Sequence, residues 1–333
     1  MGAALHQRNM RSTAHHTGQS LAEPIVRHYV PGDGWREAWL SRLLKAGLFA
    51  SFKPVMRPPV PVQVQRAVMH ALAVSMPGVG GVSIRRDTVH GLAIERITPK
   101  GVQPRHAILY LHGGAFCVGS PRSHRSITTR LAQLAQAEVF VPHYRRIPEH
   151  PYPAQIEDTI KAYRCVLQAG YAAKRVAVAG DSAGGTLSFV LPAAATAAGL
   201  PRPAALVLMS PALNLKFDSA SAQERAHRDP LIHPSWVKQA IRWLQMPHQH
   251  PLGNPQALDL AAYPPSLVQV GEDEVLHDDS IWAAQALAKA GRHAELEVYL
   301  KRWHVFQVHG AFLPGAQAAL VRQVEFMFQH WAR

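Results

Sequence analysis

The amino-acid sequence predicts an α/β protein with a mostly parallel sheet, and three observations support this prediction. The 333 residues have a globular composition, with 47 % hydrophobic and 17 % charged residues. From residue 79 onward, short apolar runs alternate with stretches whose apolar residues have helical spacing. One run passes directly into a helical stretch at the sequence AVAGDSAGG (177–185). Strands that alternate with helices form βαβ units and hence parallel sheets.

The N-terminal part of the chain differs from this pattern. Residues 1–25 are polar and histidine-rich, so we predict a disordered N-terminal extension there. Residues 35–50 and 61–76 place apolar side chains at helical spacing and predict two helices. The glycine-rich segment 78–83 then predicts a break before the first strand.

Eight apolar runs predict strands, and four stretches between them predict helices. The first two runs flank the turn His90-Gly91 and predict a hairpin at an antiparallel edge of the sheet. The predicted strands are 82–89, 92–98, 106–112, 138–144, 175–180, 205–210, 266–271 and 294–300. The predicted helices are 123–136, 154–169, 182–198 and 279–290.

The alternation lapses over residues 211–262, where only 235–245 has helical spacing. An insertion of this length between adjacent strands is uncommon in a compact domain and usually carries function, often as a lid.

Charge and composition exclude several classes of protein. The formal net charge is +13, but the lysines and arginines are scattered and match no nucleic-acid-binding motif, so we expect no nucleic-acid partner. No apolar stretch reaches the ~18 residues of a spanning helix, and the first residues lack a secretory signal pattern. We therefore predict a cytoplasmic protein whose Cys117 and Cys165 are reduced thiols.

The sequence offers no recognisable set of metal ligands. The histidine pairs at 15–16 and 248–250 lack a third ligand, so we expect no metal site and no cofactor.

Ser182 is the candidate nucleophile, because it lies in Gly-x-Ser-x-Gly where a strand is expected to become a helix. That junction is typical of the nucleophile elbow, a sharp turn that exposes the serine hydroxyl. A Cβ at Gly180 or Gly184 is expected to collide with neighbouring backbone. The start of the following helix also directs free N–H groups toward developing negative charge.

A nucleophilic serine needs donors for the oxyanion and a base that takes its proton. The segment His112-Gly113-Gly114-Ala115 follows a predicted strand, and we expect the N–H groups of Gly113, Gly114 and Ala183 to form the oxyanion hole. His304 follows the last predicted strand and is the preferred base, with His309 as the alternative.

The acid that orients the base should follow the strand at 266–271, as in the chain order Ser…Asp/Glu…His. Five carboxylates crowd that position, and spacing alone leaves the choice open: Glu272, Asp273, Glu274, Asp278 and Asp279.

Five motifs in the same order resemble the bacterial members of the hormone-sensitive lipase family of α/β-hydrolases. The motifs are HGGAF (112–116), HYRRIPEHPYPA (143–154), GDSAGG (180–185), GEDEVLHDD (271–279) and WHVF (303–306). The resemblance covers roughly residues 70–330. It implies an eight-stranded α/β-hydrolase sheet, with a cap built from the helices within 26–78 and the insertion at 211–262. The catalytic domain is then 79–333.

The resemblance also implies an activity and assigns residues to it. It suggests a carboxylesterase that needs no cofactor and acts on small-molecule esters with short to medium acyl chains. Many relatives form homodimers, so a homodimer is also expected. The nucleophile corresponds to Ser182, the base to His304 and the acid, aligned without gaps, to Glu274. Most relatives have aspartate at that last position, so Asp273 stays the alternative acid.

A second departure lies at His143 and Arg146, where relatives usually carry aspartate and leucine. We expect altered local packing and pairing there, not lost chemistry.

Three other functions remain alternatives at this stage. The same machinery serves a lactone, amide or deacetylating hydrolase, because these motifs determine the chemistry and not the leaving group. A non-catalytic ligand receptor on this fold is another alternative, although such a receptor normally lacks the histidine. The third is a basic protein that binds nucleic acid or a membrane surface.

Overall fold

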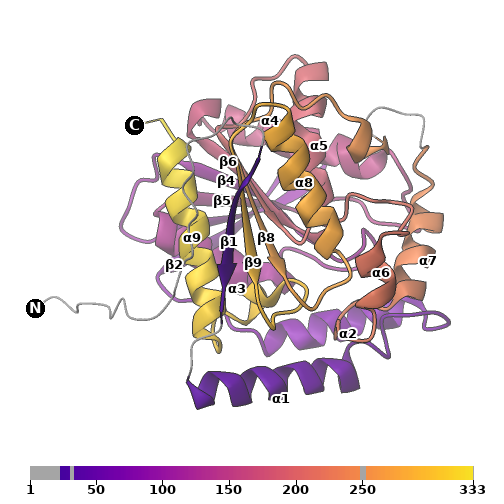
Figure 1. The fold of residues 1–333 in the computed structure, drawn as a ribbon. Coiled ribbons are helices and arrows are strands. Elements are labelled where there is room, and N and C mark those ends of the chain that lie inside the picture. Colours follow the sequence, from indigo (N-terminus) through magenta and orange to yellow (C-terminus); the bar gives the residue numbers. More distant parts are fainter. Residues whose placement is uncertain (1–22, 31–33, 248–252, 333) are drawn as a thin grey trace, which may run out of the picture.

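The computed structural model describes residues 23–30, 34–247 and 253–332 and centres on one nine-stranded sheet (Figure 1). The strand order is β1-β9-β8-β7-β6-β4-β5-β3-β2. The strands are β1 (Ile25–Tyr29), β2 (Val82–Val89), β3 (Leu92–Pro99), β4 (Ala107–Leu111), β5 (Glu138–Pro142), β6 (Val176–Asp181), β7 (Ala205–Met209), β8 (Ser266–Gly271) and β9 (Ala294–Tyr299).

The predicted mostly parallel sheet with an antiparallel hairpin edge is confirmed. Strand β2 pairs antiparallel with β3, and β3 pairs antiparallel with β5, whereas all other neighbours are parallel. Strands β4 to β7 are buried along their whole length and mostly apolar, as expected for a parallel sheet covered on both faces.

The expected number of eight strands is wrong, because β1 adds a ninth strand that pairs in parallel with β9. Its residues Ile25–Tyr29 include the last residue of the predicted disordered extension, while residues 1–22 lie outside the described residues. The segment is short, polar in part and half-exposed at the sheet edge, so its sequence pattern gives little signal. It covers β9, which would otherwise be an edge strand.

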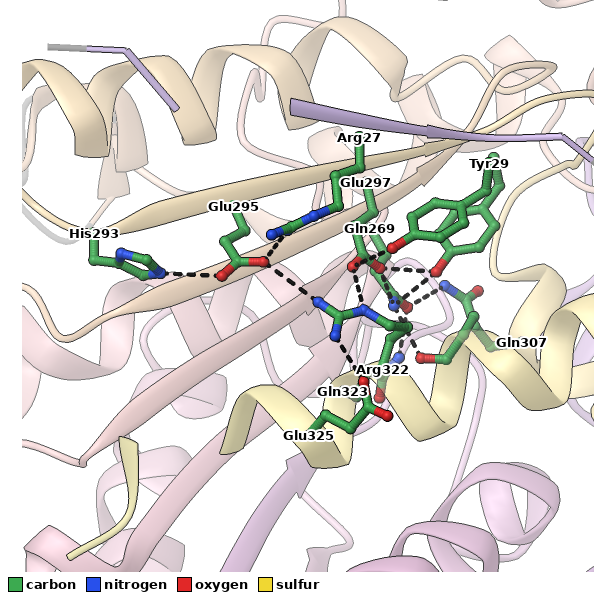
Figure 2. Close-up of polar contacts among 12 residues, drawn as sticks. Arg27, Tyr29, Gln269, His293, Glu295, Glu297, Gln307, Arg322, Gln323 and Glu325 are labelled. Carbon is green, nitrogen blue, oxygen red and sulfur yellow. Dashed lines mark hydrogen bonds and ion pairs between the residues drawn. The ribbon is translucent and has the colours of Figure 1, made fainter. Parts of the chain in front are cut away.

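Polar side chains hold β1 in place from distant parts of the chain (Figure 2). Arg27 binds Glu295 of β9, and the Tyr29 hydroxyl donates to Glu297 over 3.1 Å. Arg322 bonds both glutamates, at 3.4 and 2.9 Å. Glu297 is completely buried, so these donors are needed to stabilise its carboxylate.

Helices cover both faces of the sheet. The helices α3 and α9 pack on one face, and α4, α5 and α8 pack on the other (Figure 1). The α-helices are α1 (Trp35–Ser51), α2 (Val62–Val74), α3 (Arg125–Ala135), α4 (Ala154–Gln168), α5 (Ser182–Ala197), α6 (Ala220–Glu224), α7 (Pro234–Leu244), α8 (His277–Lys289) and α9 (Pro314–His330). The sequence analysis predicted all of these except α6 and α9.

The helices α1, α2, α6 and α7 gather at one end of the sheet, where the strands pointing down in Figure 1 finish. Ligands of parallel α/β sheets bind at the carboxyl ends of the strands. These helices therefore lie over the end of the sheet where a site is expected.

No helix in the described part of the chain is both long and apolar enough to cross a bilayer. Cys117 and Cys165 are free thiols and both are buried, as predicted. The histidines at 15–16 and 248–250 lie outside the described residues.

Candidate active site

Ser182 lies at the junction of β6 and α5, where no residue separates strand from helix. Its φ is +53°, a left-handed conformation that side chains rarely adopt and that marks backbone strain at a functional turn. The turn also requires its glycines. A Cβ at Gly184 would collide with the carbonyl of Leu111, and one at Gly180 would collide with the backbone of Gly184, as the sequence analysis expected.

The imidazole of His304 contacts a buried carboxylate. His304 Nδ1 lies 2.7 Å from Oε2 of Glu274, which is completely buried. The other oxygen of Glu274 accepts from Ser210 Oγ at 2.8 Å and from the N–H of Gly271. Burial would lower the pKa of His304, but the hydrogen bond and charge of Glu274 outweigh it and raise that pKa above 6.5.

The neighbouring carboxylates have other partners. Asp273 forms ion pairs with Lys45, at 2.7 Å, and with Arg228. Asp278 accepts from the N–H of Ser221 at 2.8 Å, and Asp279 accepts from two backbone N–H groups at 2.7 and 2.8 Å. Within the described residues, Glu274 is the only carboxylate hydrogen-bonded to His304.

The alternative base, His309, has no carboxylate partner among the residues that the structure describes. Its Nδ1 lies 3.3 Å from the carbonyl of Phe306, and its ring packs against Trp303. Burial lowers the pKa of His309 to about 4. A histidine in this setting stays neutral and lacks an acid to orient it.

The loop that carries His304 is anchored by buried amide side chains. Gln307 donates to Oε1 of Gln269 at 3.0 Å, and Gln269 donates to Glu297 at 2.9 Å (Figure 2). The polar cluster under β1 therefore extends to within three residues of His304.

The N–H of Gly113, a predicted oxyanion donor, has an acceptor within the protein. It donates to Oδ1 of Asp181 at 3.1 Å, and that carboxylate also accepts from Tyr110 at 2.7 Å. The second carboxylate oxygen lies 3.3 Å from His124 Nε2. Gly113 itself is buried.

Three other N–H groups near Ser182 have no acceptor among the described residues: those of Gly114, Ala115 and Ala183. Gly114 and Ala115 are half-buried and have positive φ, +113° and +49°. The sequence analysis did not single out Ala115, because the segment offered two glycines and no signal that an alanine would adopt a left-handed conformation.

Two apolar cavities meet at Ser182. The larger, about 120 Å³, is lined by His304 and by side chains of α1 and α2 such as Leu48 and Leu72. The smaller, about 40 Å³, contains Ala115, Ala183 and side chains of the insertion such as Ile241 and Leu244. The buried Trp236 lines both cavities, whereas Trp39 is 61 % exposed and faces outward.

The insertion is attached to the site through a carboxylate that the sequence analysis did not single out. Asp229 is completely buried, and its Oδ2 accepts from the N–H of Val275 at 3.1 Å. Its Oδ1 accepts from Leu231 and Ile232 at 2.9 and 3.0 Å. This carboxylate therefore binds the insertion to the turn that carries Glu274.

Comparisons with known proteins identify the family of this chain. A family model described as the alpha/beta hydrolase fold matches residues 108–308. An acetyl-hydrolase of Streptomyces hygroscopicus is 41 % identical over 220 residues, which cover 66 % of this chain and 74 % of that protein. An esterase of Acinetobacter venetianus is 31 % identical over 299 residues, which cover 89 % of this chain and 97 % of the relative.

Solved structures extend the similarity to almost the whole chain. The crystal structure of an esterase from the bacterial hormone-sensitive lipase family aligns with a TM-score of 0.82 and 32 % identity, covering 90 % of this chain and 100 % of that one. The chain therefore belongs to the α/β-hydrolase family and is a serine hydrolase of the carboxylesterase and lipase group, structurally close to the bacterial hormone-sensitive lipase esterases.

Proposed function

We propose that this protein hydrolyses carboxylic esters with short to medium acyl chains, with Ser182, His304 and Glu274 as a catalytic triad. The contact of 2.7 Å between His304 Nδ1 and Glu274 Oε2, beside the cavity that contains Ser182, is the observation that carries this proposal. In such a triad, His304 takes the Ser182 proton as the hydroxyl attacks the ester carbonyl. Glu274 holds the imidazole tautomer and stabilises the imidazolium that forms.

We propose the N–H groups of Gly114, Ala115 and Ala183 as the oxyanion hole, with Ala115 in place of Gly113. All three are free of protein acceptors among the described residues, and Ala115 and Ala183 line the smaller cavity with Ser182. After the attack, His304 protonates the leaving alcohol and then activates the water that cleaves the acyl-enzyme.

The two cavities suggest which part of the ester lies where. His304 must reach the leaving oxygen, so the alcohol part belongs in the larger cavity that His304 lines. The acyl chain then occupies the smaller cavity beside Ala115 and Ala183, whose 40 Å³ favours acetyl and other short acyl groups. This assignment also suits a deacetylating hydrolase, which is the second candidate function.

The remaining assignments from the sequence stay predictions. We treat α1 and α2, within residues 26–78, and the insertion 211–262 as the cap over the catalytic domain 79–333. A cytoplasmic location, a homodimer and the lack of a nucleic-acid partner likewise await measurement.

The acyl-chain profile tests the proposed function. We expect kcat/KM for p-nitrophenyl esters to be greatest for short acyl chains and to fall steeply toward dodecanoate, because the smaller cavity limits chain length. Replacing Ile241 by alanine widens that cavity and should raise the octanoate-to-acetate ratio of kcat/KM about tenfold. Leu72→Ala, in the larger cavity, is the control and should leave the ratio unchanged. No hydrolysis at any chain length would contradict the esterase proposal.

The pH profile should reflect the raised pKa of His304. The base must be neutral to accept the Ser182 proton, so kcat/KM falls as the pH drops through the pKa of His304. Because Glu274, and then the charges of Asp229 and Asp181, raise that pKa, we expect the acid limb to have its midpoint above pH 6.5. A midpoint below 6.5 in wild-type kcat/KM for p-nitrophenyl acetate would argue against this electrostatic arrangement.

A further inference from the structure

A third cavity, named the basic cavity below, lies beside the larger cavity at Ser182 and has no part in the proposed chemistry. Its volume is about 600 Å³, and its walls come from α2, β2, β3 and the segments 119–123 and 143–146. Met69 and Ser123 line both this cavity and the larger cavity at Ser182. The two cavities are therefore neighbours that share a wall.

The basic cavity is lined mainly by positively charged side chains. Its lining includes four arginines, two histidines and one carboxylate: Arg66, Arg86, Arg122, Arg146, His70, His143 and Glu95. The single carboxylate, Glu95, is already bound in two places by Arg125, at 2.9 and 2.6 Å. Glu149 binds Arg66 through both oxygens at 2.7 Å. Arg86 Nε lies 3.7 Å from the same Glu95 carboxylate. Among the described residues, Arg122 and Arg146 of the lining therefore have no carboxylate partner, and the lining keeps an excess of positive charge.

Arg146 combines partial burial with the lack of an ion pair. Its side chain is half-buried, and its Nη1 donates to the carbonyl of Gly119 at 2.9 Å. No carboxylate of the described residues forms an ion pair with it. Burial, followed by repulsion from Arg66, lowers the pKa of Arg146. A guanidinium in this setting presents fork-shaped donors that suit a carboxylate or phosphate.

His143 lies in the same segment as Arg146, and both line the cavity. Neither adds a negative charge to it, and Glu95 is the only carboxylate among the described lining residues. The lining therefore suits an anion.

We propose that this cavity binds a carboxylate or phosphate group carried by the alcohol part of the ester, with Arg146 as the principal contact and Arg122 at the exposed side. The proposal rests on the proposed function, because the alcohol part was assigned to the neighbouring cavity. It narrows the substrates to short-acyl esters of an alcohol that is itself an acid.

Paired substrates test this proposal. One series consists of acetates of ω-hydroxycarboxylic acids and of ω-hydroxyalkyl phosphates, in several chain lengths. The matched series consists of alkyl acetates of the same lengths, and acetate release is followed by pH-stat. For the best-fitting length at low salt we expect kcat/KM about tenfold above that of the neutral partner, an advantage that added NaCl reduces.

Variants identify the contact through the ratio of kcat/KM for the anionic and neutral partners. Arg146→Gln should lower this ratio about tenfold, and the exposed Arg122→Gln about threefold. Arg164→Gln removes the same charge from an exposed site outside the cavity and should keep the ratio. If Arg146 had a purely structural role, its replacement would lower kcat/KM equally for both substrates and leave the ratio unchanged.

The outcomes separate the two proposals. If the wild type hydrolyses neither series, the esterase proposal itself fails. If neutral acetates are hydrolysed but the anionic partners gain no advantage, or if the ratio survives both Arg146→Gln and Arg122→Gln, the anion site is overturned and the esterase stands. If Arg146→Gln does not fold, Arg122→Gln and the salt dependence still test the anion site. The series with the greater advantage identifies the anion as carboxylate or phosphate.

Discussion

Ser182→Ala is expected to lower kcat for p-nitrophenyl acetate by about 10⁴- to 10⁶-fold while the protein stays folded. In the proposed triad the Ser182 hydroxyl attacks the ester. Alanine has a Cβ like serine, so it adds no new backbone strain at φ +53°. What remains should come from binding and the oxyanion hole alone. The rate is measured with the wild type in parallel, and folding is checked by circular dichroism.

Ser188→Ala provides a matched control on the same helix. The Ser188 hydroxyl is buried and donates to the carbonyl of Gly184 at 2.9 Å, so its loss removes a serine without removing the proposed nucleophile. This variant should keep most of the activity. A phosphonate ester that labels active serines should modify the wild type and Ser188→Ala, but not Ser182→Ala. Labelling of Ser182→Ala at the wild-type rate would place the nucleophile elsewhere.

Glu274→Gln is expected to lower kcat about 10⁴-fold, the second-largest effect. Glutamine has the same length but no charge, so it neither holds the required tautomer of His304 nor stabilises the imidazolium. Because Glu274 raises the pKa of His304, the acid limb of the pH profile should also move to lower pH in this variant. Both effects are read from kcat and kcat/KM for p-nitrophenyl acetate as a function of pH.

Two further variants separate Glu274 from its neighbours. Glu274→Asp shortens the side chain by one methylene and should lower kcat about a hundredfold, since a displacement of this size misplaces the imidazole. Asp273→Asn should change kcat by less than about tenfold, because Asp273 pairs with Lys45 and Arg228 instead of His304. If Asp273→Asn were the damaging change and Glu274→Gln were mild, the proposed acid would be wrong.

Local sequence patterns determined the fold class and the position of the candidate nucleophile. The runs at β4 to β8 are short, apolar and bounded by turn residues, so periodicity and turn chemistry within a few residues predict them. The glycines around Ser182 are required by close backbone contacts inside one turn. Such features depend on neighbours in the sequence, and the sequence therefore reveals them.

Tertiary structure decided what depends on distant partners. Glu274 is hydrogen-bonded to His304, whereas Asp273 forms an ion pair with Lys45 on α1. Spacing along the chain cannot predict which of these adjacent carboxylates contacts the histidine. Strand β1 depends on pairing with β9 and on contacts with the distant residues Glu295 and Glu297, so its own five residues hardly predict it.

The glycine segment after β4 and the basic cavity also depend on partners that are distant in the sequence. The N–H of Gly113 is engaged by Asp181, a residue 68 positions away, and this leaves the groups of Gly114 and Ala115 free. The basic cavity joins α2, β3 and the segment around Arg146, which meet only when the chain is folded. The sequence alone determined which chemistry the chain carries, and long-range packing decided which side chains can perform it, because hydrogen-bond partners are chosen in space and not along the chain.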